Sequence, residues 1–198
     1  FSKVPFSGNS TGSQQGKIKE GLKKGKWKTY YSNGELKKIE NYKDNILNGN
    51  YFIYHKNQKL YEKGSYKDGQ KEGEYEKYYN NGKLQEKGNY KDDLAEDEWL
   101  YYYDNNLLES KRIFKNGKLN GVYYTFYQNG QISQKVSYVS GKLEGQYLKY
   151  NASGKMQQKG NYKNGKREGQ YLEFYNSGQL MYEENYINGK RDDINKYP

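Results

Sequence analysis

The sequence predicts an all-β fold: an elongated, single-sheet antiparallel β-meander that coils as a solenoid of hairpin repeats. The first observation is a fixed 24-residue period. The second is the presence of Asn-Gly and Asp-Gly dipeptides, which favour tight hairpin turns and divide each copy into two short strands. The third is that no window shows the 3.6-residue period of a helix. Glycine marks the same phase of the period at Gly25, Gly49, Gly73, Gly121, Gly145 and Gly169.

Counting from these glycines as position 1, seven copies fill residues 25–192 without insertion or deletion. Residues 16–24 read as a half repeat that caps the array, and residues 1–15 as a flexible polar leader. Residues 193–198 form a C-terminal tail. The fourth copy departs most from the pattern, with Asp97 and Arg112 in place of glycines. This departure predicts a bend or a weakened joint near residues 92–112.

The pairing of the strands assigns each position of the copy to a face of the sheet, if both turns are two-residue loops. Positions 3, 7, 12 and 18 then share one face, which we expect to be the core. Position 3 falls opposite glycine at position 16, so its ring can lie over bare backbone. The core positions are occupied by Trp27, Tyr51, Tyr75, Trp99, Tyr123, Tyr147 and Tyr171, then Tyr31, Tyr79, Tyr103, Tyr127 and Tyr175, then Leu36, Leu60, Leu84, Leu108, Ile132, Met156 and Leu180, then Tyr42, Tyr66, Tyr90, Phe114, Tyr138, Tyr162 and Tyr186.

The opposite face has one uniform aromatic row, at position 6, with lysines beside it at position 15. A solvated face of an antiparallel sheet can be wholly polar, so packing alone does not require this row. Either the rings shield the sheet and one another, or they contact a ligand. The candidate binding surface consists of Tyr30, Tyr54, Tyr78, Tyr102, Phe126, Tyr150 and Phe174 with Lys63, Lys87, Lys111, Lys135 and Lys159.

Composition excludes several classes of site. The 198 residues include no cysteine and one histidine, so there is no disulfide framework, thiolate metal site or cysteine nucleophile. The net charge of +10 suggests disorder or nucleic-acid binding, but the 17% of aromatic residues argues for a packed fold. Acidic residues are almost as frequent as lysine within the copies, so nucleic acid is a disfavoured partner.

No group of residues has the pattern of a catalytic or metal site. His55 replaces the position-7 tyrosine of its copy, and a catalytic base would need an oriented partner, whereas only Leu60 is predicted opposite it. The position-24 carboxylates read as solvated charges that offset nearby lysines: Glu72, Glu96, Glu144, Glu168 and Asp192. We therefore expect no enzyme activity, no bound metal and no cofactor.

The run from Asn161-Tyr162 through Asn164-Gly165 to Gly169 recurs around Asn89-Tyr90 and Asn185-Tyr186. It resembles the MORN repeat in its bacterial variant, whose second half reads Tyr-Tyr-x-Asn-Gly-x-Leu. Members of that variant are often labelled antitoxin-like. The resemblance implies a scaffold for protein interaction or membrane association, without catalytic residues.

We expect a non-enzymatic scaffold that binds a protein through its tyrosine-rich surface, because tyrosine supplies large contact area at low entropic cost. A second copy of the chain is one such partner. Carbohydrate or cell-wall glycan is the chief alternative, and an anionic membrane surface is another. No stretch is apolar enough to span a membrane. The start at Phe1 without methionine and the polar opening favour an exported or cell-surface protein, with a cytoplasmic one as the alternative.

Overall fold

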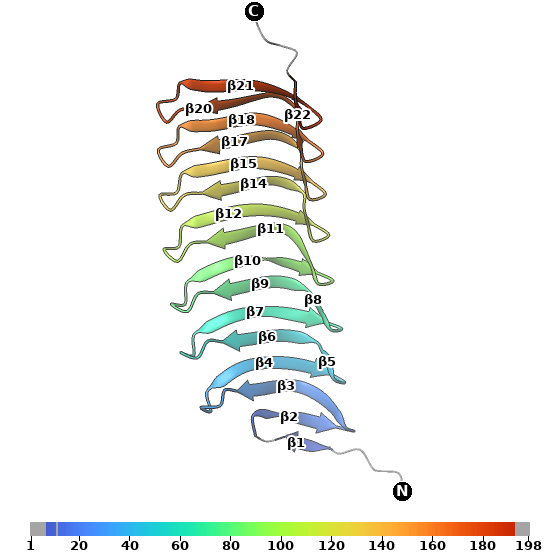
Figure 1. Ribbon diagram of the computed structural model, residues 1–198. Coiled ribbons are helices and arrows are strands. Elements are labelled where there is room, and N and C mark those ends of the chain that lie inside the picture. The colour runs from blue at the N-terminus through green and yellow to red at the C-terminus, as the bar shows by residue number, and fades with distance from the viewer. Residues whose placement is uncertain (1–6, 11, 193–198) are drawn as a thin grey trace, which may run out of the picture. The chain divides into compact units, whose positions relative to one another are not determined.

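The computed structural model describes residues 7–10 and 12–192 (Figure 1). Within these residues every regular element is a β-strand, and each strand pairs antiparallel with its neighbours in hairpins. The predicted all-β hairpin meander is therefore confirmed. The tail expected at residues 193–198 lies outside the described residues.

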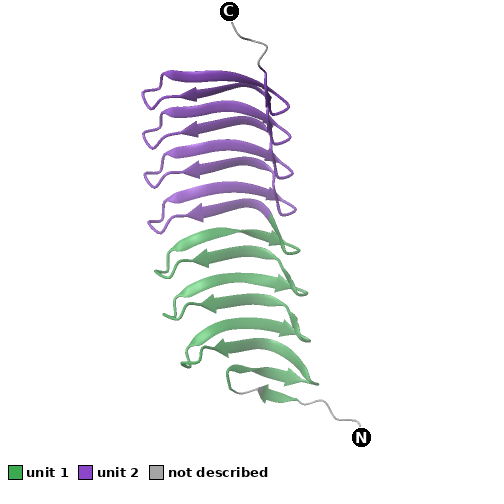
Figure 2. Cartoon of the chain, in the orientation of Figure 1, with its two compact units in different colours: residues 1–95 green, residues 96–198 purple. Residues whose placement is uncertain are grey.

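The chain divides into two compact units, residues 1–95 and 96–198 (Figure 2). In the first unit the strands form an open antiparallel sheet. Its strands are β1 Gly8–Ser10, β2 Gln14–Lys19, β3 Leu22–Tyr30, β4 Leu36–Lys43, β5 Ile46–Leu47, β6 Gly49–Tyr54, β7 Leu60–Lys67, β8 Gln70–Lys71, β9 Gly73–Tyr78 and β10 Leu84–Lys91.

The second unit repeats the same arrangement of long and two-residue strands, beginning within β11. Its strands are β11 Leu94–Tyr102, β12 Leu108–Lys115, β13 Lys118–Leu119, β14 Gly121–Phe126, β15 Ile132–Val139, β16 Lys142–Leu143, β17 Gly145–Tyr150, β18 Met156–Lys163, β19 Lys166–Arg167, β20 Gly169–Phe174, β21 Leu180–Ile187 and β22 Lys190–Arg191.

The N-terminal segment differs from the expected flexible leader. Strand β1 pairs with β2, with Gly8 opposite Ile18 and Ser10 opposite Gly16. The expectation of an unstructured leader over residues 1–15 is wrong for these strands, because the half repeat leaves a sheet edge that this segment can cover. Residues 1–6 and 11 lie outside the described part of the chain.

The two kinds of turn in each copy have different geometries. At positions 20 and 21 both residues have positive φ, as in Asp68 at 48° and Gly69 at 89°, so the predicted two-residue type I′ loop is confirmed. At positions 9 and 10 only the second residue has positive φ, as at Gly34. There the Gly34 amide donates to the Tyr31 carbonyl, and the Tyr31 amide to the Glu35 carbonyl. This is a three-residue loop of a type I turn followed by a left-handed glycine.

The longer first turn changes the strand register near it. Tyr54 pairs with Leu60, and the ladder returns to the predicted register at Ile53 opposite Glu62, with a bulge at Tyr61. The expected pairing of position 7 with position 12 is therefore wrong, and position 12 lies opposite position 6. Positions 7 and 12 do not belong to the core row, and Ile132 and Leu180 are among the exposed apolar side chains.

The core lies on the face of position 3, here called the first face. Trp27, Tyr51, Tyr75, Trp99 and Tyr171 are all buried there. Each position-3 ring meets the position-18 ring across the hairpin, and this pairing recurs in all seven copies. The pairs are Trp27 with Tyr42, Tyr51 with Tyr66, Tyr75 with Tyr90, Trp99 with Phe114, Tyr123 with Tyr138, Tyr147 with Tyr162, and Tyr171 with Tyr186.

The position-16 glycines give these rings room, and one substitution tests this. A Cβ at Gly160 would lie 2.3 Å from Cδ2 of Tyr171, whereas a Cβ at Gly64 would lie 3.0 Å from the outer edge of Tyr51. Neither glycine has the positive φ that would itself strain alanine. We expect Gly160→Ala to lower the free energy of unfolding by about 1–3 kcal/mol through overpacking. Gly64→Ala should cost less than Gly160→Ala, because Tyr51 needs to move by only a few tenths of an ångström, and equal effects in urea melts would contradict this account.

Candidate functional site

The structure places the position-6 rings and the position-15 lysines on the same side of the sheet, here called the second face. In the first unit, Lys63 lies opposite Phe52 on one neighbouring strand and opposite Glu76 on the other. Position 6 follows position 4 by two residues along the strand, so Tyr78 projects on the same side as Glu76. Strand β9 thus presents Glu76 and Tyr78 on this face, beside Lys63 on β7.

A carboxylate joins the two candidate rows in the first unit. Lys63 Nζ lies 3.0 Å from Glu76 Oε2, and the Tyr78 hydroxyl donates to the same carboxylate. Burial raises the pKa of Glu76, but the hydrogen bonds from Tyr78 and Lys63 outweigh burial and hold that pKa below its usual value. Burial, together with the bond to Glu76, raises the pKa of Tyr78. Glu76 was not predicted from the sequence, because position 4 is not a regular acidic row.

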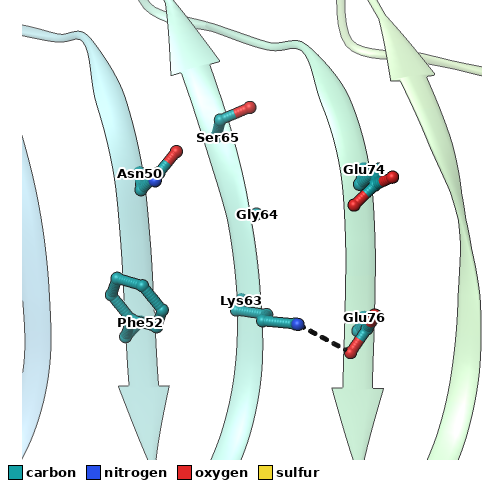
Figure 3. Close-up of a pocket in the computed structure, with 7 residues that line it drawn as sticks. All are labelled: Asn50, Phe52, Lys63, Gly64, Ser65, Glu74 and Glu76. Carbon is teal, nitrogen blue, oxygen red and sulfur yellow. Dashed lines mark ion pairs between the residues drawn. The ribbon is translucent and has the colours of Figure 1, made fainter.

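A shallow hollow of about 420 Å³ lies beside this ion pair (Figure 3). The side chains of Phe52 and Lys63 stand next to each other at one end of it, and the dashed contact in Figure 3 joins Lys63 to Glu76. Its full lining consists of Asn50, Phe52, Lys63, Gly64, Ser65, Glu74 and Glu76. The hollow is open and lined by both apolar and polar groups, and it contains no nucleophile paired with a base.

The second unit has a different second face. Position 4 is apolar in every copy of this unit. From one strand to the next, these apolar side chains alternate with the position-15 lysines. Lys111 pairs with Glu98, whereas Lys135 Nζ lies 5.7 Å from the centre of the Tyr124 ring. The position-4 residues are Leu100, Tyr124, Leu148 and Leu172.

The position-7 side chains connect one copy to the next. The Tyr31 hydroxyl donates to the Tyr54 carbonyl at 2.7 Å, and the Tyr127 hydroxyl donates to the Tyr150 carbonyl at 2.8 Å. His55 occupies the same place, with Nε2 3.1 Å from the Tyr78 carbonyl oxygen. Its ring also packs edge-on against Tyr61 at 4.9 Å. Leu60 does not lie opposite His55 as expected, because the longer turn pairs Leu60 with Tyr54.

The position-24 carboxylates also connect successive copies. Glu72 accepts the backbone N–H of Asp92 at 3.1 Å, and Glu96 accepts that of Asn116 at 2.7 Å. Glu144 and Glu168 make the corresponding bonds to Asn164 and Asn188. These carboxylates therefore hold the next type I′ turn, which the interpretation as solvated charges missed. The constant 20-residue spacing from each acid to the next turn was the available signal.

A set of cations that the sequence pattern did not predict lies among the core rings. Lys71 Nζ lies 5.0 Å from the centre of the Tyr75 ring and 4.9 Å from that of Tyr90. Arg167 lies 3.9 Å from the centre of the Tyr171 ring. These residues share position 23, where a cation can face the rings of positions 3 and 18. They fill the gaps between rings on the first face and stabilise the packing there.

No group of three or more histidine, cysteine, aspartate or glutamate side chains that could hold a metal occurs among the residues that the structure describes. Within the same residues, no helix has the length and apolar character needed to cross a bilayer. The contacts on the second face instead combine aromatic rings, lysines and a few carboxylates. Chemically, such a surface can bind a ligand through stacking, apolar contact and charge.

A family model described as the MORN repeat variant matches five segments of the chain, which together cover more than half of it: residues 23–44, 71–92, 119–140, 143–164 and 167–188. The chain belongs to this MORN repeat family. It is therefore a repeat scaffold, and MORN repeat families are generally non-catalytic. No curated protein matches the sequence.

The family model passes over two stretches where the copies depart from the common MORN pattern. One stretch contains His55 and Gln58, and the other contains Asp97 and Arg112. Both stretches still form the hairpin, with Tyr54 opposite Leu60 in one and Tyr102 opposite Leu108 in the other. The structural repeat is thus more regular than the sequence pattern that defines the family.

Proposed function

We propose that this MORN repeat protein is a non-enzymatic scaffold that binds a protein partner through its second face. On this proposal all seven copies are MORN repeats of the bacterial, antitoxin-like variant. The observation that carries it is the aromatic side chain at position 6 of every copy, on the face opposite the buried ring row. The binding surface is the one named from the sequence, formed by the position-6 rings and the position-15 lysines.

Two members of the aromatic row support a binding role over a purely structural one. The hydroxyls of Tyr54 and Tyr150 make no hydrogen bond within the described part of the chain, and both side chains are only half-buried. Their backbone carbonyls, by contrast, are fixed by the position-7 hydroxyls of Tyr31 and Tyr127. The backbone is thus held independently of these rings. Half-exposed tyrosines on a fixed backbone are suited to recognition.

The double variant Tyr54→Ser with Tyr150→Ser tests this function. We expect it to weaken partner binding by several kcal/mol in total, as loss of interface aromatics does. The thermal midpoint should fall by only about 4–8 °C, since no hydrogen bond of the fold is lost and each half-buried ring contributes about 1 kcal/mol. Binding is measured with the purified partner, first identified by cross-linking to the wild-type chain.

The matched control is Tyr54→Phe with Tyr150→Phe, which keeps the rings and should keep most of the binding. Retention of full binding by the serine pair would contradict the proposal. Specific binding to cell-wall glycan or to anionic vesicles, with no protein partner cross-linked, would assign the surface to a different ligand.

A further inference from the structure

On the second face of the second unit, apolar side chains and lysines alternate from strand to strand. We call each of these side chains, with the others on the same strand and face, a column. Lys135 lies between Tyr124 and Leu148 on its two neighbouring strands, and Lys159 lies between Leu148 and Leu172. The position-6 rings of Phe126, Tyr150 and Phe174 stand two residues further along these strands. The rings of Tyr124 and Phe126 stack with their centres 6.3 Å apart, so positions 4 and 6 lie on the same side of the sheet.

The lysines of this surface lack the acidic partners found in the first unit. There, Lys63 is paired with Glu76 at position 4. In the second unit position 4 is apolar, and neither Lys135 nor Lys159 forms an ion pair within residues 96–192. An ammonium group flanked by leucine and tyrosine favours an acidic partner, because its charge is not offset locally.

Carboxylate side chains flank this surface at both ends. Glu98 neutralises Lys111 on one side. On the other side Glu183 occupies position 15 in place of lysine, lies opposite Leu172 and accepts a hydrogen bond from Gln170. A uniformly anionic bilayer would face these carboxylates as well as the lysines. The pattern fits a ligand with discrete charges better than a membrane surface.

The spacing of the columns indicates the form of the ligand. Neighbouring strands lie about 4.8 Å apart, so Lys135 and Lys159, two strands apart, are separated by about 10 Å with Leu148 midway. In an α-helix, residues three or four apart are separated by about 5–6 Å along one face, and a heptad spans about 10.5 Å. In an extended strand, residues on one side recur about every 6.8 Å. That distance matches neither the roughly 4.8 Å between neighbouring strands nor the distance of about 10 Å between the two lysines.

We propose that the patch formed by Tyr124, Lys135, Leu148, Lys159 and Leu172 binds an acidic amphipathic helix of a partner protein. The helix lies across the strands with one heptad per copy. Its acidic side chains pair with Lys135 and Lys159, and its apolar side chains pack on the columns between them. This inference rests on the proposed function and adds to it the chemistry of the partner and the unit that binds it.

The test uses the full chain and a helix-stabilised peptide of three heptads, with leucine and glutamate alternating along one face. Fluorescence anisotropy measures its affinity for the wild type and for Lys135→Glu with Lys159→Glu. We expect the double variant to bind about tenfold more weakly at low salt. The difference should shrink as the salt concentration rises.

The matched control is Lys142→Glu with Lys163→Glu, which makes the same change in net charge near the turns of the same unit. These two lysines are exposed and lie outside the patch. We expect the control to bind nearly as tightly as the wild type. A second peptide with glutamine in place of each glutamate should lose most of its affinity, and circular dichroism checks that every variant is folded.

Equal losses in the two lysine pairs, or equal binding of the two peptides, would overturn the inference. It is also overturned if the peptide fails to bind while anionic vesicles bind in a Lys135- and Lys159-dependent way. In each case the proposed function still stands if the identified protein partner is lost from the Tyr54 and Tyr150 serine variant. Both proposals fail only if that variant also keeps its partner.

Discussion

Replacing Tyr75 by alanine should lower the free energy of unfolding by about 3–5 kcal/mol, the usual cost of deleting a large buried side chain. Tyr75 is 6% exposed and packs edge-on against Tyr90 at 5.3 Å. It lies opposite Gly88, and Lys71 faces its ring at 5.0 Å. Alanine would remove the ring from all of these contacts. Urea unfolding followed by circular dichroism measures the change.

The control for this prediction is Tyr54→Ala on the second face. Tyr54 is half-buried and its hydroxyl makes no hydrogen bond in the described residues, so we expect a loss of about 1 kcal/mol. If Tyr54→Ala destabilises the chain as much as Tyr75→Ala does, the core is not confined to the first face. The position-6 row would then be structural.

The protein should unfold as the pH rises from about 10 to beyond 12, because the fold keeps several core tyrosines neutral and their ionisation in the unfolded chain favours unfolding. Burial, together with Glu40, raises the pKa of Tyr42 to about 12. Burial also raises the pKa values of Tyr51, Tyr75 and Tyr171. A folded-state pKa above the unfolded value of about 10 contributes stability that is complete below pH 10. That stability is lost as the pH rises through the folded-state pKa.

Tyrosinate absorbance and circular dichroism, recorded along the same pH series, measure this transition. The buried tyrosines should ionise together with the loss of β-structure, after the exposed ones have ionised. Tyr75→Phe removes one of the ionising hydroxyls and should shift the transition to higher pH. Unfolding that precedes ionisation of the buried tyrosines would contradict this mechanism.

The sequence was sufficient to predict the long strands of the repeats and one of the two turns, but not strand β1 in the segment expected to be a leader. The period places strands between turns, and Asp68-Gly69 can take only a few conformations because both residues need positive φ. At the first turn the dipeptide signal was ambiguous, since Asn81-Gly82 suits both a type I′ turn and a type I turn followed by glycine. The Asn81 side chain decides between them, because its oxygen accepts the Lys83 amide at 2.9 Å.

That single ambiguity explains the errors in the rest of the register. One extra loop residue moved Leu60 from His55 to Tyr54, and the ladder recovered only after the bulge. The pairing of Phe52 with Lys63 lies beyond the bulge and followed the predicted register. Between copies, Tyr66 pairs with Lys71 but Lys63 pairs with Glu76, so Glu72 and Gly73 form a second bulge that sets the contact of Lys63 with Glu76. No dipeptide signals that bulge, so the charge balance of the second face could not be predicted.

Most of the side-chain ties between successive copies run forward along the chain, whereas Asn45, Gln58 and Asp93 reach back to Lys23, Leu36 and Lys71. The Tyr31 hydroxyl reaches forward to the Tyr54 carbonyl, and the Glu72 carboxylate reaches forward to the Asp92 amide. A copy therefore carries many of the side chains that fasten its successor. During synthesis, a copy that has left the ribosome already presents the acceptor and donor groups that the next hairpin needs. This polarity favours folding that advances one hairpin at a time from the N-terminal side, in step with translation.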